Sequence, residues 1–254
     1  MRKTIFSTLI AMMICVGAHA QNIGIIAHRG FWNSMNAAQN SIKAMKNAQQ
    51  RNFYGTEFDV WITKDDVVVL FHDAAIKGIK IEDATFAELS ALQIDNGEVI
   101  PTLDSFFTHG GISQTKYILE IKSHSTPEAE SRVVKGVLDI VKRHKLENNI
   151  DYISFSKFIC QSLVKDNAQH RVSYLNGELS PKEAKELGFW GIDYNYKIFE
   201  KNPTWIQDAK QIGLTVNVWT VNEPIKMQKM IDAGVDFITT DDPSMLTGII
   251  YKTK

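Results

Sequence analysis

Short apolar segments alternate with helical patterns along most of this chain. Past residue 110 the apolar segments recur at intervals of roughly twenty to thirty-five residues, and one helical pattern separates each pair. Because strands that are joined through helices run parallel, this alternation predicts a parallel sheet. With two earlier segments, the expected strands are 23–27, 56–61, 117–121, 152–155, 172–175, 191–194, 215–219 and 236–239.

Prolines and glycines mark the helix boundaries between these segments. Helices are expected to begin at Thr126-Pro127 and Ser180-Pro181, and one is expected to end at Gly234. Eight strands with intervening helices favour an α/β fold of the TIM (β/α)8 barrel type, in which the active site lies at the C-terminal ends of the strands. A doubly wound open sheet is the alternative, although the sequence contains no G-x-G-x-x-G phosphate loop.

The alternation is interrupted between residues 64 and 111. A turn near residue 65 leads into an apolar run at 67–71, which predicts a hairpin with the second strand. Short helices are expected at 83–92 and 101–107. We interpret about 64–111 as a small subdomain that is inserted after the second strand.

The first twenty residues have the form of a secretory signal peptide. Arg2 and Lys3 precede an apolar run, and an Ala-His-Ala sequence that ends at Ala20 resembles a cleavage site. The run is shorter than the ~20 residues that span a bilayer, which argues against a stable membrane anchor. We expect a leader at 1–20, a barrel domain at 21–254 and a periplasmic location.

The charge balance narrows the choice of partners. The chain has 28 Lys and Arg against 29 Asp and Glu, a formal net charge of −1, so nothing in its charge points to nucleic acid or an anionic membrane. After the leader, Cys160 is the remaining cysteine, which excludes an intramolecular disulfide. We expect Cys160 to lie in the core and the partner to be a small-molecule substrate.

Three carboxylates are expected to meet at one face of the barrel. Glu57 and Asp59 alternate on a strand, so their side chains point to the same side about 7 Å apart, and Glu120 ends the next barrel strand. Buried carboxylates repel one another unless a cation lies between them. Oxygen ligands favour Ca²⁺ or Mg²⁺, so one divalent cation is expected here. The alternative is a salt bridge with Lys122 or Arg29.

Two histidines are expected beside this cluster. His28 and His72 each follow an apolar strand directly. One such histidine is more often structural, but two at corresponding strand ends, with carboxylates between them, favour a general acid and a general base. Arg29 offers a planar fork of donors that suits a phosphate, and Lys122 offers a point charge. Asp73 would orient His72 or cap the following turn.

The polar motifs occur in a defined order: His28-Arg29-Gly30, Glu57-x-Asp59-Val60, Thr63-Lys64-Asp65, His72-Asp73, Pro101-Thr102-Leu103, Glu120-x-Lys122, Trp219-Thr220 and Thr240-Asp241-x-Pro243. In order and spacing they resemble the signature of the glycerophosphodiester phosphodiesterase family, over nearly the whole of the expected mature chain. The resemblance implies a TIM barrel with an insertion after the second strand. It also implies a phosphodiesterase that releases an alcohol and glycerol 3-phosphate.

The resemblance also implies a role for each site residue. These roles are acid–base catalysis by His28 and His72, phosphate contacts from Arg29 and Lys122, a divalent cation on Glu57, Asp59 and Glu120, and a pocket wall for the glycerol or alcohol portion from Trp219. Trp219 would otherwise belong to the barrel core.

The sequence departs from the family pattern in two places. Gln39 replaces a glutamate that the family commonly has, which removes a negative charge near His28 and Arg29. The stretch after Asp73 lacks the usual Leu-x-Arg-x-Thr run, so the leaving-group side is expected to be atypical. These differences bear on specificity more than on the type of reaction.

Three other functions fit parts of the sequence. A phospholipase-type enzyme, like a phosphatidylinositol phospholipase C or a sphingomyelinase D, would need an exposed apolar rim, which Phe31 and Trp32 would supply. A catalytically silent glycerophosphodiester- or glycan-binding protein is compatible with Gln39. A sugar-processing barrel would use Glu57 and Glu120 as paired acids, but the histidines would then have no purpose.

Overall fold

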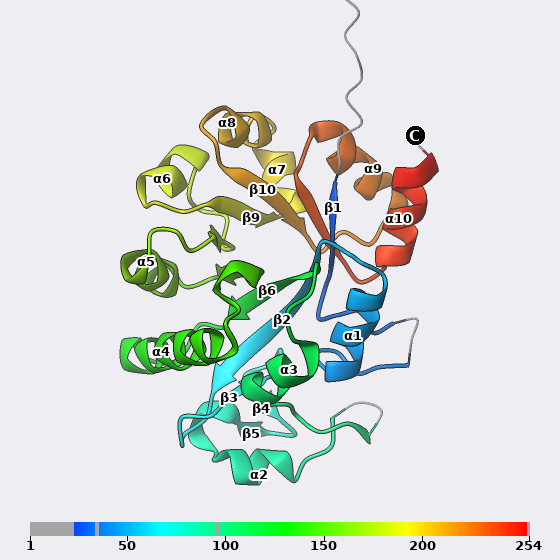
Figure 1. Ribbon diagram of the computed structural model, residues 1–254. Helices are drawn as coiled ribbons and strands as arrows, with labels where there is room; N and C mark the ends of the chain where they lie inside the picture. The colour runs from blue at the N-terminus through cyan, green and yellow to red at the C-terminus, as the bar shows by residue number, and fades with distance from the viewer. Residues whose placement is uncertain (1–22, 34–35, 95–96, 253–254) are drawn as a thin grey trace, which may run out of the picture.

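Eight parallel strands close into a barrel in the computed structural model, which describes residues 23–33, 36–94 and 97–252 (Figure 1). Each strand pairs with the next around the ring, and pairing of the first strand with both its neighbours closes it. The strands are β1 (Gly24–Ala27), β2 (Gly55–Ile62), β6 (Lys116–Ile121), β7 (Ile150–Ser154), β8 (Val172–Tyr174), β9 (Gly191–Asn195), β10 (Thr215–Trp219) and β11 (Phe237–Thr240). The expected TIM barrel is confirmed. The expected leader lies outside the described residues.

Helices surround this barrel (Figure 1). They are α1 (Ile42–Gln50), α3 (Leu103–Gly110), α4 (Pro127–His144), α5 (Lys157–Asp166), α6 (Pro181–Glu186), α7 (Tyr196–Lys201), α8 (Trp205–Gln211), α9 (Pro224–Ala233) and α10 (Pro243–Lys252). Helix α4 begins where the sequence predicted. Thr126 caps it by accepting a hydrogen bond from the Ala129 N–H. None of the helices in the described ranges is both long and apolar enough to cross a bilayer.

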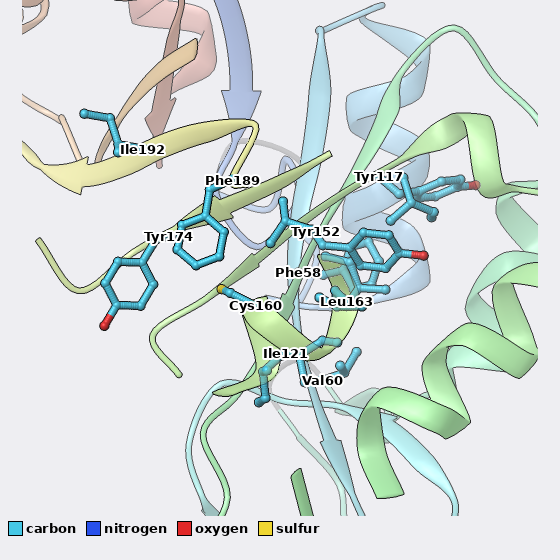
Figure 2. Close-up of a cluster of buried hydrophobic side chains, with 14 of the residues drawn as sticks. Phe58, Val60, Tyr117, Ile121, Tyr152, Cys160, Leu163, Tyr174, Phe189 and Ile192 are labelled. Atoms are coloured by element: carbon cyan, nitrogen blue, oxygen red, sulfur yellow. The ribbon is translucent and has the colours of Figure 1, made fainter. Parts of the chain in front are cut away.

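The main core lies between the barrel and these helices (Figure 2). Aromatic side chains from successive strands fill it, among them Phe58, Tyr117 and Tyr152. Cys160 on α5 is fully buried there, as the sequence led us to expect. Such close packing holds the strand ends, and hence the polar residues on them, in fixed relative positions.

The chain leaves the barrel after β2. There β3 (Val68–Leu70) pairs with β2 in the expected hairpin, and it is followed by β4 (Ala75–Ile76), β5 (Ile79–Lys80), the 3-10 turn η1 (Ile81–Asp83) and α2 (Phe86–Ser90). A separate apolar cluster, which includes Trp61, Val69 and Leu89, stabilises this excursion. The helix α3 contacts α1 and α4 and so belongs to the outer ring (Figure 1). Within the expected range of 64–111, the excursion itself therefore occupies about 64–101.

Candidate active site

A sharp turn after β1 brings the backbone of Arg29 to the carboxylate cluster. Arg29 and Gly30 have φ values of +54° and +82°, and a Cβ on Gly30 would lie 2.6 Å from the Ala44 Cβ. This conformation and the close approach require glycine at residue 30. The turn directs the Arg29 backbone N–H to Glu57 Oε2, at 2.7 Å.

The three predicted carboxylates meet in the structure. Parallel pairing of β2 with β6 sets Asp59 beside Glu120, and Glu57 lies two residues earlier on the same face of β2. One oxygen from each residue lies within 4.8 Å of the others, and all three side chains are buried. The prediction that these residues lie together is therefore correct.

Lys122 partly neutralises this cluster. Its Nζ lies 2.7 Å from Glu120 Oε1 and 3.2 Å from Asp59 Oδ1. Burial is the largest single influence on both Lys122 and Asp59 and opposes their ionisation, but the surrounding opposite charges and hydrogen bonds together outweigh it. The pKa of Lys122 is therefore raised and that of Asp59 is lowered. Lys122 and Asp59 form the stable ion pair of the cluster.

The two glutamates resist ionisation. Burial and the charges of Asp59 and Glu120 raise the pKa of Glu57 well above its usual value, while burial and Asp59 raise the pKa of Glu120 to about 8. In addition, Glu57 Oε1 is buried with no hydrogen-bond partner among the described residues. A divalent cation would favour both ionised glutamates and supply that partner, so the donor set fits such an ion.

Asn40 positions Asp59, a role that the sequence did not reveal. The Asn40 Nδ2 donates to Asp59 Oδ2 at 2.9 Å, and the Asp59 N–H donates to Asn40 Oδ1 at 3.0 Å. Asn40 itself has φ +59°, a backbone conformation that asparagine tolerates. The sequence signal that could have identified Asn40 is its position two residues before the start of α1.

Both histidines are oriented by carboxylates. His28 Nδ1 lies 2.7 Å from Asp241 Oδ1, and His72 Nδ1 lies 2.6 Å from Asp73 Oδ1. Asn222 holds Asp241 through its Nδ2 and through a hydrogen bond from the Asp241 N–H. In each histidine the Nε2 is therefore the nitrogen that remains for a substrate.

The two histidine environments differ in solvent exposure and charge. The side chain of His28 is 20% exposed and that of His72 is 40% exposed. Burial is the main cause of a lowered pKa at His72, and the charge of Arg29 lowers it further, whereas Asp59 acts in the opposite direction. His72 therefore releases a proton more readily than an ordinary histidine does.

One cavity of about 120 Å³ joins most of the predicted site residues. It is lined by His28, Arg29, Glu57, His72, Glu120, Lys122 and Trp219, with Ile153, Phe155, Leu175, Asp193, Thr220 and Thr239. Asp59 lies behind this wall, linked to it through Lys122. Trp219 lies at the cavity wall because its Nε1 donates to the Asp193 carbonyl at 2.8 Å and its ring packs edge-on against Phe155.

A second cavity, of about 400 Å³, shares Arg29 and His72 with the first. Residues from the excursion, among them Phe71 and Lys77, line its other side. Gln39 lies at this cavity and accepts a hydrogen bond from Arg29 Nη1 at 2.7 Å. The departure at Gln39 thus places a neutral amide directly on the predicted phosphate-binding arginine.

Two other residues revise the expectations from sequence. Phe31 is 1% exposed and packs against Phe53, so it does not supply the apolar rim that a lipid-active enzyme would need. His124 is an additional positioning residue: its Nε2 accepts from the Ile62 N–H and its Nδ1 lies 2.7 Å from the Lys122 carbonyl. It ties the ends of β2 and β6 together beside the carboxylates.

Comparison with known proteins agrees with this geometry. The sequence model of the glycerophosphoryl diester phosphodiesterase family matches residues 28–245. A glycerophosphodiester phosphodiesterase from Caldanaerobacter subterraneus is 30% identical over 244 residues, which cover 90% of this chain and 98% of the relative.

Solved structures share the fold. The crystal structure of a glycerophosphodiester phosphodiesterase from Parabacteroides distasonis has a TM-score of 0.90 and 45% identity, with coverage of 92% of this chain and 98% of that one. An Oleispira antarctica phosphodiesterase, solved with the product sn-glycerol-3-phosphate, has a TM-score of 0.77 and 22% identity, with coverage of 90% and 96%. At that lower identity the likeness concerns the fold alone.

Proposed function

Since this chain belongs to the glycerophosphodiester phosphodiesterase family, we propose that it hydrolyses glycerophosphodiesters to an alcohol and glycerol 3-phosphate by acid–base catalysis with His28 and His72. The observation that carries this proposal is the shared cavity. It brings two carboxylate-oriented histidines, an arginine, a lysine and buried glutamates around one space. That combination suits a phosphodiester anion.

The proposed roles of the cationic residues differ from those of the carboxylates. Arg29 and Lys122 would bind the phosphate oxygens, because both cations line the cavity between the histidines. Glu57, Asp59 and Glu120 would hold one Ca²⁺ or Mg²⁺ ion, whose chemical contribution is to stabilise negative charge on the phosphoryl group. Asn40 and the Arg29 N–H keep the carboxylates in place.

The two cavities support different roles for the two histidines. His72 lines both the small cavity and the larger one beside the excursion, whereas His28 lines only the small one. We place the glycerol unit in the small cavity and the leaving alcohol in the larger one. His72 Nε2 would then protonate the departing alcohol oxygen as its bond to phosphorus breaks, and His28 Nε2 would accept the proton of the hydroxyl that forms the new bond to phosphorus, with Asp241 stabilising the resulting imidazolium. That hydroxyl belongs either to water or to carbon 2 of the glycerol unit, and in the second case water would open the resulting cyclic phosphate to give glycerol 3-phosphate.

Glycerophosphocholine hydrolysis provides the direct test. The purified protein should release choline and glycerol 3-phosphate without inorganic phosphate, chelation should abolish turnover, and Ca²⁺ or Mg²⁺ should restore it. His109→Ala on α3 changes an exposed histidine outside the site and should leave turnover unchanged. Tight binding of the diester without any turnover would instead support the binding-protein alternative, and full activity after verified metal removal would refute the cation.

A further inference from the structure

One buried carboxylate of the site, Asp193, has no part in the proposed reaction. Asp193 lies in the middle of β9 with its side chain inside the barrel and is 2% exposed. It lines both the site cavity and a separate cavity of about 20 Å³ in the barrel interior. It therefore forms part of the floor of the site, below the residues that follow the strand ends.

None of the lysines, arginines or histidines in the described ranges forms an ion pair with the Asp193 carboxylate. Its Oδ1 is buried and has no hydrogen-bond partner within the described part of the chain. Burial raises the pKa of Asp193 to about 7, and the neighbouring amide of Asn217 counteracts this only in part. A buried acceptor without a partner is unfavourable, so a group that donates to it on binding would be stabilised.

The walls above Asp193 restrict what this group can be. Ile153, Leu175 and the rings of Phe155 and Trp219 form an apolar lining. The Asp193 carbonyl itself fixes the Trp219 ring by accepting from its Nε1. A short carbon chain that ends in a hydroxyl satisfies both the apolar walls and the single unpaired acceptor.

The depth of Asp193 indicates which hydroxyl reaches it. Arg29 and Lys122 follow the ends of their strands, whereas Asp193 lies two residues before the end of β9. A substrate with its phosphate at the two cations would point the far end of its glycerol unit toward the floor. The 2-hydroxyl would stay nearer the phosphate.

Building on the proposed function, we propose that Asp193 accepts a hydrogen bond from the terminal hydroxyl of the glycerol unit. Asp193 is thereby a specificity-determining residue, which selects glycerol diesters over diesters whose buried end lacks a hydroxyl. Its contact is with the part of the substrate that does not react, so it acts through binding and alignment of the reacting group.

The test pairs changes in the enzyme with changes in the substrate. Glycerophosphocholine is compared with its propane-1,2-diol analogue, which lacks the terminal hydroxyl, and with its propane-1,3-diol analogue, which lacks the 2-hydroxyl. Loss of the terminal hydroxyl should lower kcat/KM of the unmodified enzyme about 10- to 100-fold, the range for one hydrogen bond to a charged group. Asp193→Ala should lose the same factor on glycerophosphocholine and should no longer distinguish it from the propane-1,2-diol analogue.

Two further variants control for folding and for general effects on the barrel interior. Asp193→Asn preserves the size of the side chain and should reduce the discrimination without a change in folding, as monitored by the unfolding temperature. Ser173→Ala changes a buried polar residue that lines the cavity of about 20 Å³ but not the site cavity. This variant should distinguish glycerophosphocholine from the propane-1,2-diol analogue as well as the unmodified enzyme does.

Several outcomes would overturn the inference. If both Asp193 variants kept the full discrimination, Asp193 would be a structural residue of the barrel interior. If the Asp193 variants instead lost the ability to distinguish a glycerol diester of ethanolamine from one of ethanol, the carboxylate would lie at the amine of the leaving group.

If the unmodified enzyme hydrolysed none of the three diesters, the proposed function would fail. Calorimetry of the unmodified protein and of Asp193→Ala, with glycerol 3-phosphate and with propane-1,2-diol 1-phosphate, would then test Asp193 separately. If removal of the terminal hydroxyl lowered the affinity of both proteins equally, the contact would again be refuted.

Discussion

At the scale of single residues, both site histidines contact a carboxylate through Nδ1, which leaves Nε2 for the proposed reaction. The carboxylates come from different sources, because Asp73 is adjacent in sequence to His72, whereas Asp241 is separated from His28 by 213 positions. Asp241 is in turn held by Asn222. His28 therefore has the more firmly supported orientation, and His72 has the more exposed side chain.

The first prediction separates the two histidines. Replacing either His28 or His72 by Ala should reduce turnover of glycerophosphocholine about 10²- to 10⁴-fold, as expected for the loss of general acid–base catalysis. A glycerol diester of p-nitrophenol needs little protonation of its leaving group, so His72→Ala should be largely rescued on that substrate and His28→Ala should not. Rescue of His28→Ala alone would reverse the assignment, and small losses in both variants would make the histidines structural.

The second prediction concerns Gln39. Arg29 lowers the pKa of His72, so a carboxylate at residue 39, facing Arg29 Nη1, should weaken that influence and raise this pKa. An acid must be protonated to act, so the alkaline limb of the kcat/KM profile of Gln39→Glu should move to higher pH.

Gln228→Glu on α9 adds the same charge at a residue that lines neither of the two site cavities, and it serves as the control. A profile that does not differ from that of the control would show that residue 39 does not tune His72. Movement of the acidic limb instead would identify His72 as the base.

At the scale of elements, the pairing of β2 with β6 creates the carboxylate cluster. The two strands place Glu57, Asp59 and Glu120 on one inward face, and His124 connects the strand ends. The excursion after β2 has its own apolar cluster and forms one side of the larger cavity. If the leaving alcohol lies in the larger cavity as proposed, the sequence of the excursion can vary with that alcohol while the carboxylate cluster stays unchanged.

The third prediction tests the cluster through stability. Ca²⁺ or Mg²⁺ at a hundredfold excess over its dissociation constant should raise the unfolding temperature of the unmodified protein by about 5–10 °C, because it binds the folded state. Glu57→Gln should fold but lose most of this shift. Glu130→Gln, which changes a buried glutamate outside the cluster, should retain it. An equal shift in all three proteins would place the cation elsewhere.

At the scale of the whole molecule, barrel closure assembles the site from distant parts of the chain. Pairing of β1 with both β2 and β11 brings His28 to Asp241 and the Arg29 backbone N–H to Glu57. Helices pack around the closed sheet and fix these positions (Figure 1). The site is consequently a property of the complete ring, and no single half of the barrel contains it.

The fourth prediction concerns export of the molecule. The charged start, the apolar run and the Ala-His-Ala sequence lead us to propose that residues 1–20 direct secretion and are removed. Protein isolated from its native host should begin at Gln21 and occur in the periplasmic fraction, as shown by N-terminal sequencing. An intact Met1 on protein from the cytoplasmic fraction would contradict this proposal.

The sequence by itself determined the elements and the residue types of the site. The strands near 117–121 and 215–219 and the start of α4 at Pro127 were predictable, because hydrophobic periodicity and helix caps act over a few neighbouring residues. The same locality applies to Glu57 and Asp59, since alternation along one strand alone places both on one face.

Only the tertiary structure decided which distant side chains meet. The contacts of His28 with Asp241 and of Asn40 with Asp59 depend on strand register and on closure of the barrel. Phe31 is aromatic in the sequence and was a candidate for the rim, but packing against Phe53 buries it. Asp193 is one carboxylate among many until the fold buries it and leaves its Oδ1 without a hydrogen-bond partner among the described residues, because burial and pairing are properties of the surrounding chain and not of the residue.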